Sequence, residues 1–192
     1  RALGSRSIIG DARSETMQSI MNRKIKFRES FRPFAPCVLR EDVKEYFDMP
    51  DSQESPYMLL VAPVNKDKRL SIENKNENLK GLEKLKTKRS SIPAVTHVDY
   101  SARVQTVDAV RNPKLHRLMS RFKEISSCPV IINTSFNIRG EPIVCTPEDA
   151  YRCFMATNMD VLVMEDVLLY KEKQPQAKEH EIDDYKAQFQ LD

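Results

Sequence analysis

The sequence contains few glycines and no tryptophan: only 4 of its 192 residues are glycine. It has no GxxxxGK[ST] or GxGxxG phosphate loop, and no GxSxG elbow of the kind that carries a hydrolase nucleophile. A nucleotide site in this chain must therefore bind phosphate through side chains. No apolar run has transmembrane length, and residues 1–7 lack the features of a secretory signal peptide. We expect a cytoplasmic protein that does not contact membranes.

The cysteines lack the CxxC pairing of zinc sites and the regular spacing of secreted disulfide frameworks. Apolar residues flank them, which favours buried free thiols and no protein-bound metal. The four residues concerned are Cys37, Cys128, Cys145 and Cys153.

The composition is that of one soluble globular domain, with 40% hydrophobic and 31% charged residues in 192. The formal net charge is only +3, which argues against general binding of polyanions. Positive residues nevertheless gather between positions 23 and 32, so a local anionic partner is expected.

Hydrophobic spacing predicts an alternation of helices and strands. Helices are predicted at 15–25, at 41–47, and after Asn112-Pro113 and Thr146-Pro147, where a capping residue precedes a proline. Strands are predicted at 32–39, 57–62, 94–99, 102–107, 129–132, 161–164 and 167–170. Residues 65–91 are rich in Lys, Asn and Glu, which favours a solvated loop. The alternation predicts an α/β fold with a twisted, mixed sheet covered by helices.

Three cations form the first candidate site: Lys26 and Arg28 flank Phe27, and Arg32 follows. In an extended segment Lys26 and Arg28 would face the same side and could bind one phosphate group together. From charge alone, a solvated basic face is the stronger interpretation.

Polar residues after the strand at 129–132 form the second candidate. Hydroxyls and amides at a strand end can bind phosphate or base edges without placing charge in the core. A turn that closes the strand explains any one of them equally well, but the cluster favours a binding site. Its members are Asn133, Thr134, Ser135, Asn137 and Arg139, followed by Gly140.

The third candidate comprises His97, Asp99 and Arg103. Two ligands at i and i+2 are too few for a metal site, and a lone histidine is more often structural than catalytic. Arg103 has apolar neighbours on a predicted strand, so it needs an anionic partner and is the better candidate for ligand binding.

Taken together, the segments resemble the YrdC-like nucleotide-binding fold. Residues 26–35 (KFRESFRPFA) are similar to its KxR segment, residues 102–104 (ARV) to its arginine-bearing strand, and residues 134–142 (TSFNIRGEP) to its SxN signature. Residues 1–7, 92–99, 102–107 and 133–137 also resemble the C-terminal region of O-carbamoyltransferases that act on antibiotics and nodulation factors. The resemblance extends to about residue 170.

This resemblance implies a division into three parts. Residues 1–14 would link to an upstream domain outside this sequence, 15–170 would form the YrdC-like domain, and 171–192 a polar C-terminal tail. The domain would form carbamoyl adenylate from ATP and carbamoyl phosphate, with Mg²⁺ arriving on the ATP. An upstream metal-bearing domain would then pass the carbamoyl group to a hydroxyl, so complete transfer is not expected of this chain alone.

The same resemblance assigns roles to the candidate residues. Lys26, Arg28 and Arg103 would neutralise phosphates, and Ser135 and Asn137 would position them. Neighbours of second rank would be Arg32, Asn133, Thr134 and Arg139.

Two alternatives stay open. The first is threonylcarbamoyl-adenylate synthesis, against which the segments at 1–7 and around His97 argue. The second is a non-catalytic RNA-binding module, which the small net charge makes weaker.

Overall fold

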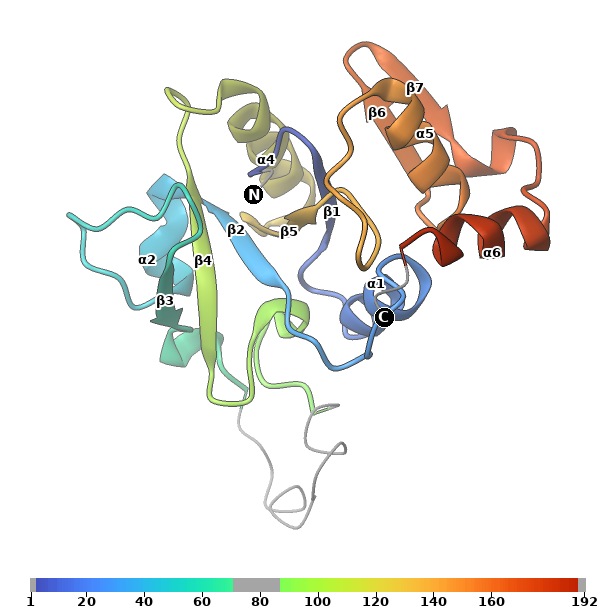
Figure 1. The fold of residues 1–192 in the computed structure, drawn as a ribbon. Coiled ribbons are helices and arrows are strands. Elements are labelled where there is room, and N and C mark those ends of the chain that lie inside the picture. Colours follow the sequence, from blue (N-terminus) through green and yellow to red (C-terminus); the bar gives the residue numbers. More distant parts are fainter. Residues whose placement is uncertain (1–2, 71–86, 190–192) are drawn as a thin grey trace.

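The computed structural model describes residues 3–70 and 87–189, which form a mixed five-stranded sheet with helices around it (Figure 1). The strand order is β1-β5-β2-β4-β3, and only the β2–β4 pair is parallel. The predicted α/β class and mixed sheet are therefore confirmed. The strands are β1 (Ser7–Asp11), β2 (Ala35–Leu39), β3 (Leu60–Pro63), β4 (Ser101–Val107) and β5 (Val130–Ser135).

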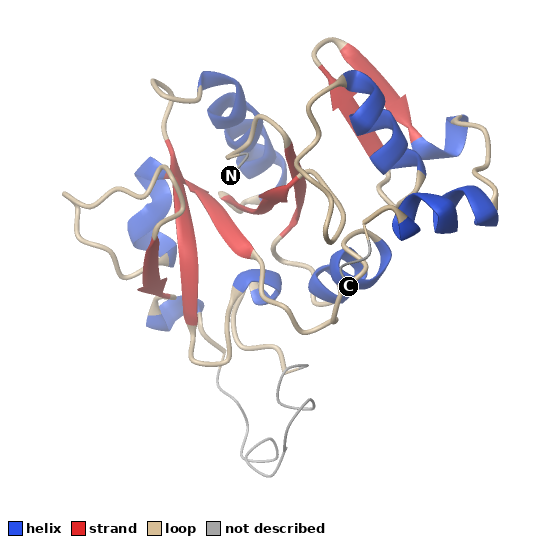
Figure 2. Cartoon of the chain, viewed as in Figure 1, coloured by secondary structure: helices blue, strands red, loops and turns tan. Residues whose placement is uncertain are grey.

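Helices lie around the strands, as Figure 2 shows. In the C-terminal part, α5 and α6 accompany a separate antiparallel hairpin of β6 and β7, beyond β1 in Figure 1. The α-helices are α1 (Met17–Lys24), α2 (Val43–Tyr46), α4 (Pro113–Ser126), α5 (Pro147–Met155) and α6 (Glu179–Ala187). The hairpin strands are β6 (Val161–Met164) and β7 (Val167–Tyr170). Short 3₁₀ turns are η1 (Arg40–Asp42), η2 (Lys66–Lys68), η4 (Pro93–Val95) and η5 (Lys171–Lys173).

The core occupies both faces of the sheet because its central strands are apolar on both sides. All residues of β2 are buried, as are the first four of β5. On one face, Leu115 and Met119 of α4 pack against Leu39 and Ile131. The other face carries the larger cluster, to which α1 contributes Met21. Both faces of the sheet are thus covered, as a mixed α/β sheet requires.

The two proline-initiated helices begin where the capping signals predict. The Asn112 side chain accepts a hydrogen bond from the Leu115 amide at the start of α4. At the start of α5, Thr146 and Asp149 form a reciprocal capping box. These side chains satisfy amides that the helix itself leaves without partners.

Two predicted strands differ in the structure. The segment at 57–62 was expected to be buried, but β3 begins at Leu60 and pairs within the described sheet only with β4. Val61 on this edge strand is 64% exposed, and Leu59 just before the strand is 67% exposed. The strand predicted at 94–99 is wrong: that segment forms η4 and a turn, in which the Thr96 hydroxyl donates to the Ile92 carbonyl.

Other sequence expectations hold in part. Cys37, Cys128 and Cys153 are buried free thiols, but Cys145 is exposed, contrary to the prediction. Most of the loop predicted at 65–91 lies outside the described residues, since 71–86 are not described. Helix α6 lies within the predicted tail at 171–192, and its Tyr185 is buried. The domain boundaries remain predictions. Across 3–70 and 87–189, no helix is both long and apolar enough to span a membrane.

The position of β3 at the edge predicts a contrast between two valines on paired strands. Val104→Ala should lower the free energy of unfolding by about 2 kcal/mol, because Val104 is fully buried. Val61→Ala should lower it by less than about 0.5 kcal/mol, because that side chain is largely in solvent. Urea unfolding of both variants measures the contrast. Equal losses would contradict the edge placement of β3.

Candidate functional site

A polar pocket of about 160 Å³ lies where one end of β5 meets the beginnings of β2 and β4. β2 runs antiparallel to β5, so its first residue Ala35 pairs with Asn133 near the end of β5. β4 is parallel to β2, so Arg103 near the start of β4 lies at the same end of the strands as Ala35. The topology therefore unites parts of all three predicted candidates. The pocket is lined by Leu3, Arg28, Pro33, Phe34, Ala35, Met58, Arg103, Asn133, Thr134 and Ser135.

Arg28 is fixed in the wall of this pocket by a neutral partner. Its Nε donates to Asn22 Oδ1 over 2.6 Å, and its guanidinium lies 4.8 Å from the centre of the Phe34 ring. Asn22 is fully buried and donates to the carbonyls of Ser30 and Arg32. Burial lowers the pKa of Arg28, and neighbouring Arg32 lowers it further. The side chain still carries a positive charge, because an arginine does not lose its proton in a protein.

Lys26 lies behind the pocket wall and not on it, with only 3% of its surface exposed. Its Nζ donates to the carbonyls of Ser135 and Asn137 and to Asn137 Oδ1. Residues 26–28 do not form the extended segment in which Lys26 and Arg28 would face the same side, because the Phe27 backbone is left-handed, with φ 48°. The turn directs Lys26 inward and Arg28 to the pocket. The solvated basic face is therefore also wrong for Lys26.

The bonds to Lys26 organise the loop that follows β5. Ser135 Oγ donates to Asn137 Oδ1 over 2.7 Å, and Asn137 Nδ2 donates to the Glu141 carbonyl over 2.7 Å. The Glu141 carboxylate accepts the Ile138 amide over 2.8 Å. Ser135 lines the pocket, whereas Asn137 lies next to it and shapes the loop. Sequence reasoning missed Glu141, whose acidic charge gave no reason to place it at an anion site.

Asn133 is buried and bonded across the sheet. Its Nδ2 donates to Gln105 Oε1 over 2.6 Å, and Gln105 Nε2 donates to the Leu3 carbonyl over 3.2 Å. Gln105 is a second residue that sequence reasoning missed, because a single glutamine on a strand gives no signal. The chain of amides ties the N-terminal segment to the floor of the pocket.

Arg32 and Arg139 lie outside the pocket lining and are exposed. Both contact the same carboxylate: Arg32 lies 3.2 Å and Arg139 3.9 Å from Glu29. Their charges are partly neutralised within the protein.

His97 and Asp99 occupy the turn before β4. Asp99 Oδ1 accepts the amide and hydroxyl of Ser101, which closes this turn. Burial lowers the pKa of His97, Asp99 raises it, and Arg103 lowers it. Within the described parts of the chain, no three His, Cys, Asp or Glu side chains are grouped so that they could hold a metal ion.

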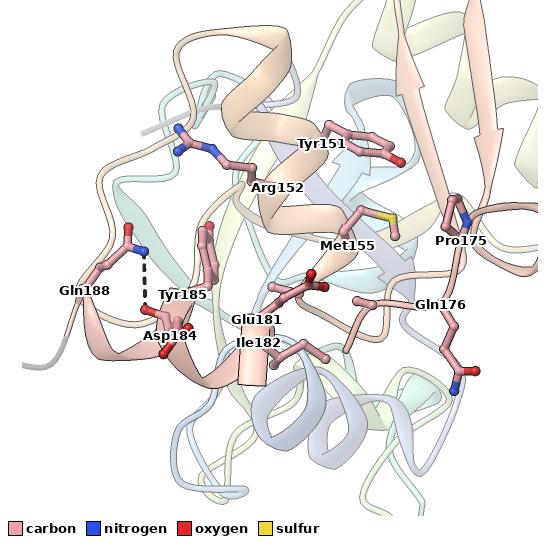
Figure 3. A pocket seen from close by; sticks show the side chains of 12 residues that line it. Tyr151, Arg152, Met155, Pro175, Gln176, Glu181, Ile182, Asp184, Tyr185 and Gln188 are labelled. Carbon is pink, nitrogen blue, oxygen red and sulfur yellow. Dashed lines mark hydrogen bonds between the residues drawn. The ribbon is translucent and has the colours of Figure 1, made fainter. Parts of the chain in front are cut away.

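A larger cavity of about 390 Å³ lies between α5 and α6 (Figure 3). Its lining includes Tyr151 and Met155 of α5 and Ile182 and Tyr185 of α6. Its lining is mainly apolar and includes none of the predicted site residues. The smaller pocket is lined by two arginines and the polar end of β5, which suit an anion better than the apolar lining of the larger cavity does. The smaller pocket is therefore the candidate site.

Comparison with known proteins finds that residues 1–171 match the family model described as Carbamoyltransferase C-terminus. An uncharacterized protein of Synechocystis is 56% identical over the whole chain, which covers 31% of that relative. Nodulation protein NolNO of Sinorhizobium fredii is 42% identical over 89% of the chain and 22% of its own length. The 3'-hydroxymethylcephem-O-carbamoyltransferase of Streptomyces clavuligerus is 35% identical over 79% of the chain and 24% of its own length. The chain thus spans less than a third of each relative.

Buried Lys26 predicts a pH dependence of stability. Burial, and next the charge of Arg28, lowers the pKa of Lys26 from 10.5 to about 7 in the folded protein. Above about pH 7 the unfolded chain keeps a proton that the folded chain has lost, so this residue makes stability rise with pH. Below that pH both states are protonated and the slope disappears. Between about pH 6.5 and about pH 8.5, wild type should gain about 2 kcal/mol of unfolding free energy relative to Lys26→Met.

Urea unfolding of both proteins at the two pH values measures this difference. Lys26→Met serves as the control for all other titrating groups, because wild type and variant both contain them. Parallel pH profiles would show that the Lys26 ammonium stays charged in the folded state and that the prediction is wrong.

Proposed function

Because this chain belongs to the carbamoyltransferase family, whose C-terminal domain it matches, we propose that its pocket activates a carbamoyl group with ATP. The observation that carries the proposal is the convergence of Arg28 and Arg103 on the polar end of β5. Two guanidinium groups can bind and neutralise phosphate oxygens, while Asn133, Thr134 and Ser135 can contribute polar contacts without charge.

The size of the pocket limits which part of a nucleotide it holds. At about 160 Å³ it is smaller than the roughly 300–1,000 Å³ typical of sites that enclose a whole drug-sized ligand. It suits a few phosphate groups, or a molecule as small as carbamoyl phosphate. The nucleoside of ATP would then lie at the pocket mouth.

The proposed reaction joins the carbamoyl group to AMP. Water first displaces phosphate from carbamoyl phosphate and leaves carbamate. A carbamate oxygen then forms a bond to the α-phosphorus of ATP, the bond from that phosphorus to the β-phosphate oxygen breaks, and pyrophosphate leaves. The products are carbamoyl adenylate, pyrophosphate and phosphate.

The residues would act mainly through positioning and charge, which dominate catalysis of phosphoryl and nucleotidyl transfer. Arg28 and Arg103 would bind the phosphates directly. Lys26 would hold the loop at 135–137, and a bound phosphate would raise its pKa and keep it charged. Mg²⁺ arriving with ATP would supply further neutralisation of the phosphates.

The second step, transfer to a hydroxyl acceptor, would belong to the part of the protein outside this chain. The segment that the relatives share with this chain is 22–31% of their own length, which supports an additional domain. Threonylcarbamoyl-adenylate synthesis and RNA binding are not favoured by any contact in the pocket, and both are outcomes that the tests can reveal.

We predict that the chain exchanges labelled pyrophosphate into ATP when carbamoyl phosphate is present, without carbamoylating a hydroxyl acceptor. Arg28→Ala and Arg103→Ala should each lower the exchange rate about ten- to a hundred-fold, as expected when a charge-assisted contact to a reacting phosphate is lost. Arg121→Ala, on the exposed side of α4, is the matched control. Thermal unfolding of each variant separates lost binding from lost folding.

Three outcomes would contradict the proposal. Exchange that persists in the Arg28→Ala, Arg103→Ala double variant would place the activating site elsewhere. Exchange that requires threonine would favour the threonylcarbamoyl alternative. Thermal stabilisation by short RNA duplexes but not by ATP would favour the RNA-binding alternative.

A second comparison tests the loop that follows β5. Asn137→Ala should weaken ATP binding several-fold, because the amide bonds to Lys26, Ser135 and the Glu141 carbonyl. Cys145→Ser should leave binding unchanged, since this exposed thiol lies outside the pocket lining. Isothermal titration calorimetry measures both affinities. Loss of binding in the folded Cys145→Ser variant would point to a thiol function instead.

A further inference from the structure

Helix α6 contacts both chain segments that form the back of the pocket. Lys186 Nζ lies 4.5 Å from the centre of the ring of Phe27, the residue that stands between Lys26 and Arg28 in the sequence. The Tyr185 hydroxyl donates to Glu141 Oε1, in the loop that follows β5. Just beyond the end of the helix, the backbone of Phe189 approaches Gly140 so closely that a Cβ there would clash with the Phe189 carbonyl oxygen. One helix thus contacts the segment around Lys26 and the loop around Asn137.

Glu141 connects this helix to the site residues. Its two carboxylate oxygens have different partners: Oε1 accepts from Tyr185, and Oε2 accepts the Ile138 amide. Its carbonyl accepts from Asn137 Nδ2, and Asn137 Oδ1 accepts from Lys26 and Ser135. A continuous path of hydrogen bonds therefore runs from α6 to Ser135 in the pocket wall.

We propose that α6 is a positioning element for the site, in which Tyr185 holds the Glu141 carboxylate and thereby fixes the loop at 135–141. The inference rests on the proposed function for its consequence in catalysis, but the fixing of the loop does not. Tyr185 touches neither the pocket nor a reacting group, so it is a positioning residue and not a catalytic one.

The chemistry of Tyr185 suits this task. The residue is 8% exposed, and its ring meets that of Phe189 edge to face at 5.3 Å. Burial, and next the bond to Glu141, raises the pKa of the Tyr185 hydroxyl, so it keeps the proton that it donates. The family match ends at residue 171, so α6 is not among the features on which family membership rests.

The same cavity offers a matched control. Tyr151 lines the same cavity as Tyr185 (Figure 3), and its hydroxyl interacts with Gln174 at 3.4 Å. Tyr185→Phe and Tyr151→Phe therefore remove the same atom from the same cavity. Only the first removes a bond to Glu141.

Two measurements on the full chain test the proposal. The first is amide hydrogen exchange of peptides covering residues 136–142 without ligand, which should become faster in Tyr185→Phe but not in Tyr151→Phe. The second is the concentration of ATP that gives half-maximal pyrophosphate exchange. It should rise roughly three- to ten-fold in Tyr185→Phe and stay unchanged in Tyr151→Phe. A variant that merely loses folded protein would lower the maximal rate without moving this concentration.

Each result has one meaning. Unchanged amide exchange in Tyr185→Phe overturns the proposal, and so does faster amide exchange with an unchanged half-saturating ATP concentration. If wild type shows no pyrophosphate exchange while Tyr185→Phe loosens residues 136–142, the proposed function fails and the fixing of the loop by α6 stands.

Discussion

The buried ammonium of Lys26 is the constraint on which the site depends. A charge removed from water needs close polar partners, and this one obtains them from the carbonyls of Ser135 and Asn137 and from the Asn137 side chain. The bonds join the end of α1 to the end of β5. They also require the chain to reverse at Phe27, and that reversal places Arg28 in the pocket wall. Together with the bond from the Arg139 amide to the Lys26 carbonyl, they hold the two segments against each other.

Local signals predicted the parts of the fold that local physics determines. The caps at Asn112 and Thr146 defined the starts of α4 and α5, because each cap acts within three residues. The segments at 57–62 and 94–99 were misjudged for a different reason. A short apolar run in the sequence does not indicate whether its strand lies at the centre or the edge of a sheet. It also does not indicate whether another strand is present to pair with it. Among the described strands β3 pairs with one, β4, and residues 97–100 form a turn.

The residues at the site likewise fall into those that the sequence indicated and those that only the fold brings together. The sequence predicted Arg28, Arg103 and Ser135 as candidates from their residue types and from the resemblance, and all three line the pocket. It did not identify Gln105, Glu141 or Tyr185. The contacts of these residues join positions far apart in the chain, such as Tyr185 with Glu141 and Gln105 with Asn133. No periodicity or motif specifies such pairs, and only the folded arrangement brings them together.

The direct partners of the cations also distinguish a binding role from a structural one. Arg32 and Arg139 contact the carboxylate of Glu29, so their charge is partly compensated within the protein. Arg28 is anchored instead by the amide oxygen of Asn22, and Lys26 by carbonyl and amide oxygens. Neutral acceptors fix a cation in place without cancelling its charge, so Arg28 keeps its positive charge in the pocket wall. An anionic ligand is the partner that such an arrangement lacks, and a phosphate group would supply the missing charge.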